Sequence, residues 1–71
     1  MFWWFEREGV YTRYEVIELP QGAGYELKII DPDGTEHIER FTDADELANR
    51  QRALEAELKA QGWTGPHGWV L

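Results

Sequence analysis

The sequence predicts an α+β domain in which a four-stranded antiparallel sheet is followed by one helix that packs on one of its faces. Residues 2–41 contain four runs rich in β-branched and aromatic residues, separated by turns that contain glycine and proline. The stretch 43–61 instead repeats its apolar residues at helical spacing. Because 71 residues suffice for one domain only, we expect residues 1–71 to form a single domain in ββββα order.

The sharpest local signal lies between the last two predicted strands. Asp31-Pro32-Asp33-Gly34 places proline, aspartate and glycine where a type I turn with a left-handed bulge residue needs them, which predicts a hairpin. Pairing Asp31 with Thr35 sets Tyr25 against Phe41 on one face and Glu26 against Arg40 on the other, as a possible ion pair. The four strands are expected at 2–6, 10–19, 25–31 and 35–41.

The helix is expected over 43–61. Thr42 or Asp43 can cap its first turn, and acidic residues follow at the positive end of the helix dipole. Gly62 suits the left-handed position after the last turn, which would bring Trp63 back onto Leu58 in a Schellman motif. Residues 62–71 then form a tail rich in tryptophan and glycine. The stripe for packing consists of Ala44, Leu47, Gln51, Leu54 and Leu58.

The N-terminal aromatic run, Phe2-Trp3-Trp4-Phe5, holds more apolar area than one helix can cover. Successive strand residues point to opposite faces, so two of these four rings lie on each side of the sheet. Either the tail with Trp69 or a second subunit covers the remainder, and the sequence leaves both open. The candidate interaction surface is Trp3, Trp4, Phe5 and Trp69. We expect a homodimer formed through apolar residues of the sheet face or of the N-terminal strand, in particular Trp3, Trp4 or Phe5.

Charge restricts the partners. Fourteen acidic and seven basic residues give a formal net charge of −7, and the basic residues are spread along the chain, so neither nucleic acid nor an anionic membrane is expected as a partner. The apolar N-terminal run is too short for a signal peptide or a membrane span, which predicts a cytoplasmic protein. The absence of cysteine excludes disulfides and fits a reducing compartment.

Motifs for catalysis or cofactor binding are not found. The chain contains neither serine nor cysteine, and no glycine-rich loop joins a strand to a helix as a phosphate site requires. His37 and His67 fall on separate elements without a spacing diagnostic of a metal site. We therefore expect no catalytic residue, no metal and no cofactor.

A resemblance covers most of the chain. It rests on Arg40-Phe41-Thr42-Asp43-Ala44-Asp45-Glu46-Leu47-Ala48-Asn49-Arg50-Gln51 and on the tail Gly62-Trp63-Thr64-Gly65-Pro66-His67-Gly68. In these stretches the chain resembles a family of small uncharacterised bacterial proteins that share a Gly-Trp-x-Gly-Pro-x-Gly tail. The resemblance implies strands first and the helix and tail last, and it implies no activity.

Three functions remain after these exclusions. The leading hypothesis is a non-enzymatic module for protein–protein interaction, because aromatic residues are in surplus and no nucleophile or cofactor motif is present. The first alternative is a single-stranded nucleic-acid binder, with Trp3, Trp4, Tyr11 and Tyr14 as a stacking platform on the sheet. The second is an acidic inhibitor that mimics nucleic acid toward a basic partner.

Overall fold

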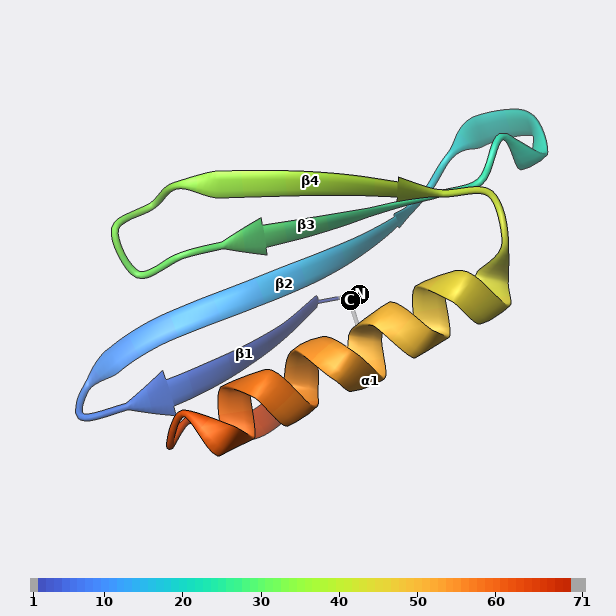
Figure 1. Cartoon of the computed structure of the whole chain (residues 1–71). Coiled ribbons are helices and arrows are strands. Elements are labelled where there is room, and N and C mark those ends of the chain that lie inside the picture. Colours follow the sequence, from blue (N-terminus) through green and yellow to red (C-terminus); the bar gives the residue numbers. More distant parts are fainter. Residues whose placement is uncertain (1, 70–71) are drawn as a thin grey trace.

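A computed structural model describes residues 2–69 of the chain, Trp69 by its backbone alone. Five strands form one antiparallel sheet in the order β4-β3-β2-β1-β5, and one helix crosses a face of that sheet (Figure 1). A short 3-10 turn, Pro20–Gly22, lies between the second and third strands. The elements are β1 Phe2–Arg7, β2 Val10–Glu18, β3 Tyr25–Ile30, β4 Glu36–Phe41, α1 Ala44–Ala60 and β5 Thr64–Trp69.

The predicted four-stranded sheet in ββββα order is wrong, because the tail forms a fifth strand on the far side of β1. β5 pairs antiparallel with β1, so that Trp4 lies opposite His67 and Glu6 lies opposite Thr64. The register shifts between Trp4 and Glu6, which leaves Gly65 and Pro66 together opposite one residue of β1. A bulge on an edge strand tolerates proline, since the missing N–H there removes no ladder hydrogen bond.

Glycine in β5 allows the aromatic rings of β1 to approach its backbone. A Cβ on Gly65 would lie 2.8 Å from Cδ2 of Phe5, and a Cβ on Gly68 would lie 3.2 Å from Cδ1 of Trp3. The φ of Gly65 is +144°, a conformation that residues with a side chain rarely adopt. Gly65 and Gly68, which the sequence placed in a tail after the helix, are therefore the residues that let this segment dock as a strand.

The β3–β4 hairpin has the predicted register. Asp31 N donates to Thr35 O at 2.9 Å and closes the turn, and Tyr25 lies opposite Phe41. The predicted ion pair is also confirmed, because Arg40 Nε donates to Glu26 Oε2 at 2.8 Å. The turn residues thus determine the pairing of the whole hairpin.

Both ends of α1 follow the predicted capping. Asp43 has an extended backbone, and its side chain accepts a hydrogen bond from Asp45 N at 2.9 Å. At the other end Gly62 has a φ of +89°, and Trp63 N donates to Leu58 O at 3.0 Å, as in a Schellman motif. This turn directs the chain from the helix into β5.

The core lies between α1 and one face of the sheet. Tyr14 is its largest fully buried side chain, and its hydroxyl donates to Glu55 Oε2 of the helix at 2.8 Å. Burial, together with this hydrogen bond to a carboxylate, raises the pKa of Tyr14 well above its ordinary value. Because the core lies on the side of the sheet that carries α1, the helix covers only one face of the sheet. The buried apolar residues are Phe5, Tyr14, Leu27, Leu47, Leu54 and Trp63.

Candidate protein-interaction surface

The face of the sheet opposite α1, which we call the open face, is not covered by any element among residues 2–69. Strand alternation places on it the neighbours of the core residues, so Trp4 of β1 shares this face with Tyr11 of β2 and with Ile38 of β4. Tyr11 is 57% exposed and Ile38 is 56% exposed. Large apolar side chains that stay this exposed on one sheet face are typical of a contact surface.

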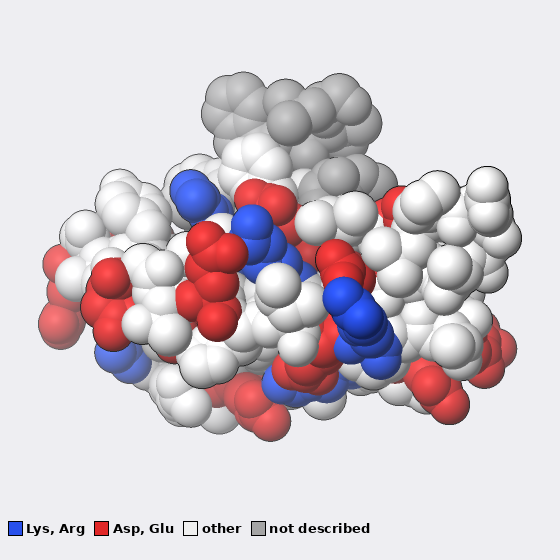
Figure 2. Space-filling model, turned by 90° about the horizontal axis from the view of Figure 1, so that it is seen from above, with Lys and Arg blue, Asp and Glu red and all other residues white. Residues whose placement is uncertain are grey.

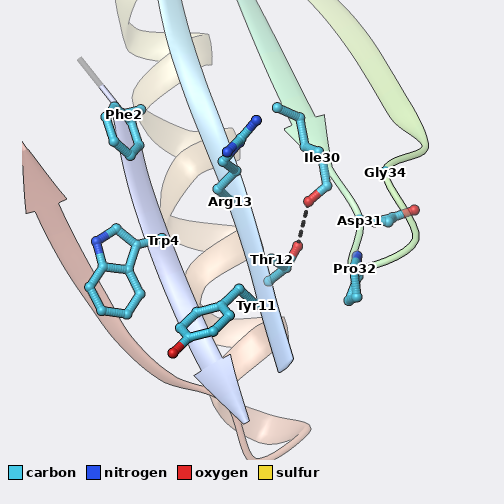
Figure 3. Close-up of a pocket in the computed structure, with 9 residues that line it drawn as sticks. All are labelled: Phe2, Trp4, Tyr11, Thr12, Arg13, Ile30, Asp31, Pro32 and Gly34. Carbon is cyan, nitrogen blue, oxygen red and sulfur yellow. Dashed lines mark hydrogen bonds between the residues drawn. The ribbon is translucent and has the colours of Figure 1, made fainter. Parts of the chain in front are cut away.

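A groove of about 670 Å³ crosses this face between β1 and the β3–β4 turn (Figure 3). In Figure 3 the helix lies behind the sheet, and the side chains of Trp4 and Tyr11 lie on the viewer's side of it. The Thr12 hydroxyl donates to Ile30 O at 3.0 Å and ties the groove floor across two strands. The groove is lined by Phe2, Trp4, Tyr11, Thr12, Arg13, Ile30, Asp31, Pro32 and Gly34.

Trp4 is the groove side chain that contacts an aromatic ring on each side. Its ring stacks on His67 of β5 at a centroid distance of 4.3 Å and meets Tyr11 of β2 edge-on at 5.7 Å. Neighbours on both sides hold the indole in one orientation before any partner arrives, which reduces the entropy that binding must remove. A fixed, partly exposed tryptophan is the kind of side chain that dominates protein-binding energy.

Of the four side chains expected to form the interaction surface, the structure describes those of Trp3, Trp4 and Phe5, and it separates these three. Phe5 is fully buried in the core, and Trp3 is half-buried on the helix side, where its ring stacks on Tyr14 at 5.0 Å. Of these side chains, Trp4 lines the groove. The backbone of Trp69 lies opposite Phe2, and its side chain is outside the described residues.

This separation also divides the aromatic platform considered for nucleic acid. Trp4 and Tyr11 lie on the open face, whereas Trp3 and Tyr14 face the helix. Ile30 and Ile38 join the open face without having been named from the sequence as site residues. The period-two alternation from Trp4 across the predicted hairpin register could have found them, once it was known which face the helix covers.

Charge on the open face is nearly balanced. Lys28 Nζ lies 3.2 Å from Glu36 Oε1, and Arg40 is bonded to Glu26, so opposite charges neutralise one another along β3 and β4. The face carries three basic side chains (Arg13, Lys28, Arg40) and four acidic ones (Glu6, Glu15, Glu26, Glu36), so the acidic surplus lies elsewhere on the molecule. In the view of Figure 2 acidic and basic side chains are interspersed and form no basic stripe.

Among the described residues, no three or more His, Asp or Glu side chains form a group that could hold a metal ion. His37 Nε2 lies 2.9 Å from Asp31 Oδ2, but this pair stands exposed at the hairpin and has no third ligand beside it. Every buried side-chain nitrogen or oxygen among the described residues has a hydrogen-bond partner. None is thus left free to receive a ligand from within the core.

No helix within residues 2–69 combines the length and the apolar character needed to cross a membrane. Comparison with known proteins identified no relative, since no protein-family model, curated protein or solved structure matches the chain. Any functional conclusion therefore depends on the geometry of the open face and its groove.

Proposed function

We propose that this chain is a non-enzymatic, cytoplasmic module that binds a partner protein on its open face, with Trp4 as the central contact. The observation that carries the proposal is the groove of about 670 Å³ around a tryptophan held between Tyr11 and His67. A partner would insert an apolar side chain there, and the paired charges of β3 and β4 would form the polar rim that such interfaces have.

Binding of single-stranded nucleic acid is the second candidate, favoured by the position of Arg13 beside Trp4 and Tyr11 in the groove. Two features weigh against it. Asp31 lines the same groove, and the open face as a whole has no excess of basic side chains that could follow a phosphate backbone. Mimicry of nucleic acid would instead use the acidic surface outside the open face.

The test compares Trp4→Ala with the control Val10→Ala, which removes an exposed apolar side chain at the β1–β2 end of the sheet, outside the groove. Partners captured with the unmodified chain are identified, and their affinity for each variant is measured. We expect Trp4→Ala to weaken binding by about 30-fold or more, as at an interface hot spot, and Val10→Ala to leave it within about threefold. Circular dichroism verifies that both variants are folded.

Two results would overturn the proposal. One is a partner that binds unmodified protein and Trp4→Ala with equal affinity, which would move the interface off the groove. The other is saturable, salt-sensitive quenching of tryptophan fluorescence by oligonucleotides that Trp4→Ala abolishes, which would favour the nucleic-acid alternative. A captured nucleic-acid-binding protein that is displaced by oligonucleotides, and whose binding ignores Trp4, would indicate mimicry.

A further inference from the structure

We propose that two copies of this chain pair through the outer edge of β4, antiparallel and two-fold symmetric about Ile38, so that their sheets join into one. The surface differs from the groove and from the N-terminal aromatic residues expected from the sequence to form a homodimer. It goes beyond the proposed function, because it needs no partner other than a second copy of the chain.

Every second residue of β4 directs its backbone groups away from β3. In the hairpin, Asp31 N donates to Thr35 O, so Thr35 and every second residue after it direct their N–H and C=O groups toward β3. The intervening residues, Glu36, Ile38 and Arg40, direct theirs away from the sheet. β4 is the first strand in the sheet order, so among the described residues no strand accepts these groups.

Symmetry about Ile38 determines the register of the pairing. If Ile38 lies opposite Ile38 of the second copy, Glu36 lies opposite Arg40 of that copy and Arg40 opposite its Glu36. All three residues with outward backbone groups then pair, and each opposed pair can exchange two hydrogen bonds. On the helix side of the sheet the same register sets His37 against Glu39 of the second copy.

Side-chain complementarity supports this register. Charged residues on an edge strand ordinarily oppose pairing, but here the symmetry places acid against base on both sides of a central isoleucine pair. Arg40 is 77% exposed and Glu36 is 50% exposed at their side chains, so both can reach across. The existing Glu26 to Arg40 bridge would thereby extend to Glu36 of the second copy.

Neighbouring registers lack this complementarity. Symmetry about His37 sets Glu36 against Ile38 of the second copy and leaves the outward groups of Arg40 without a strand residue opposite. Symmetry about Glu39 sets its carboxylate against the same carboxylate of the second copy, and like charges directly opposite destabilise a strand pair. Only pairing about Ile38 uses every outward group and opposes no like charges.

The geometry of the axis has a consequence for the open face. Residues opposite one another in a ladder share a face, so both helices lie on one side of the joined sheet and both open faces lie on the other. Ile38, 56% exposed in the single chain, becomes the seam between the two open faces. The two grooves therefore point in the same direction.

Sedimentation velocity at about 100 µM tests the assembly. We expect twice the 8.3 kDa mass of one chain. Ile38→Lys places like charges on the axis and should give the single-chain mass, whereas the control Ile17→Lys, on the same face but in interior strand β2, should remain a dimer. Glu36→Arg sets two guanidinium groups opposite each other on both sides of the axis and should dissociate the dimer.

Amide hydrogen exchange gives a readout that does not depend on any variant. Exchange at Glu36, Ile38 and Arg40 should slow at least tenfold between dilute and concentrated unmodified protein, while exchange at His37 and Glu39, already bonded to β3, changes little. A single-chain mass throughout, or a dimer in which these three amides exchange freely, would refute the proposal. Trp4→Ala should dimerise normally, so failure of this proposal and failure of the groove proposal are separable.

Discussion

Gly65→Ala is expected to release β5 from the sheet, because the added methyl group has no space. Its Cβ would lie 2.8 Å from Cδ2 of Phe5 and 3.0 Å from the carbonyl oxygen of Trp4. Phe5 is fully buried and cannot turn aside without disturbing the core. The substitution therefore combines a backbone conformation that only glycine adopts readily with overpacking against a fixed ring.

The two contributions can be separated with Gly9→Ala as a control. Gly9 also has a positive φ, +78°, but a Cβ there would meet nothing within 4 Å. We expect Gly9→Ala to cost about 1 to 2 kcal/mol of backbone strain. Gly65→Ala should lose about 1 to 3 kcal/mol from strain and a further 1 to 3 kcal/mol from overpacking.

Urea denaturation followed by tryptophan fluorescence at 25 °C measures both free energies of unfolding. A core of this size supplies only about 3 to 5 kcal/mol in total, so Gly65→Ala should be close to unfolded or should lose β5 while the rest stays folded. Equal losses in the two glycine variants, within about 0.5 kcal/mol, would show that Gly65 does not lie against Phe5. That result would contradict the packing of β5 against β1.

Three further perturbations probe the helix and its contacts. Tyr14→Phe should lower the free energy of unfolding by about 1.5 to 3 kcal/mol, because it removes the hydrogen-bond donor to Glu55. The pKa of Tyr14 is raised in the folded state. Above pH about 10 the unfolding free energy of the unmodified protein should therefore fall, relative to this variant, by about 1.4 kcal/mol per pH unit. Asp43→Ala should cost about 1 kcal/mol, measured by urea denaturation, since it removes the helix cap. Arg7→Met should cost about 0.5 to 1 kcal/mol in the same assay, because the guanidinium lies 4.5 Å above the ring of Trp63.

The sign of the pH effect follows from where the proton is held. Above pH about 10 the unfolded chain loses the phenolic proton of Tyr14, whereas the folded chain keeps it, so the unfolded state binds fewer protons and stability declines with rising pH. Below pH about 10 the Tyr14 hydroxyl is protonated in both states, and its contribution to the free energy of unfolding is fully present. A pH profile identical in the unmodified protein and in Tyr14→Phe would contradict burial of this hydroxyl beside Glu55.

The sequence predicts the hairpin and the helix ends because their signals are local. Asp31-Pro32-Asp33-Gly34 determines a turn, and the turn determines the register of every pair from Ile30 with Glu36 back to Tyr25 with Phe41. Asp43 and Gly62 act on the backbone groups of adjacent turns. In each case the interacting groups lie within a few residues of one another or are joined by one short turn.

Local signals do not predict β5, because the residues of β1 against which it packs are far away in the sequence. Gly65, Pro66 and Gly68 have low strand propensity, and their role becomes visible only when the rings of Trp3 and Phe5 are placed against them, more than 60 residues away in the case of Gly68. The expectation that Trp3, Trp4 and Phe5 form one surface is wrong for a similar reason. Alternation separates neighbours, but only tertiary packing decides which face the helix covers.

The irregular edge of β5 also limits the number of copies that pairing through β4 can join. A sheet with two regular edges can add strands at both and grow without end. Here Pro66 and the bulge disrupt the β5 edge, so β4 is the regular edge of the described sheet. Pairing of β4 with its own copy consumes the regular edge of both chains at once. The symmetric contact therefore closes at two copies and leaves disrupted edges outside.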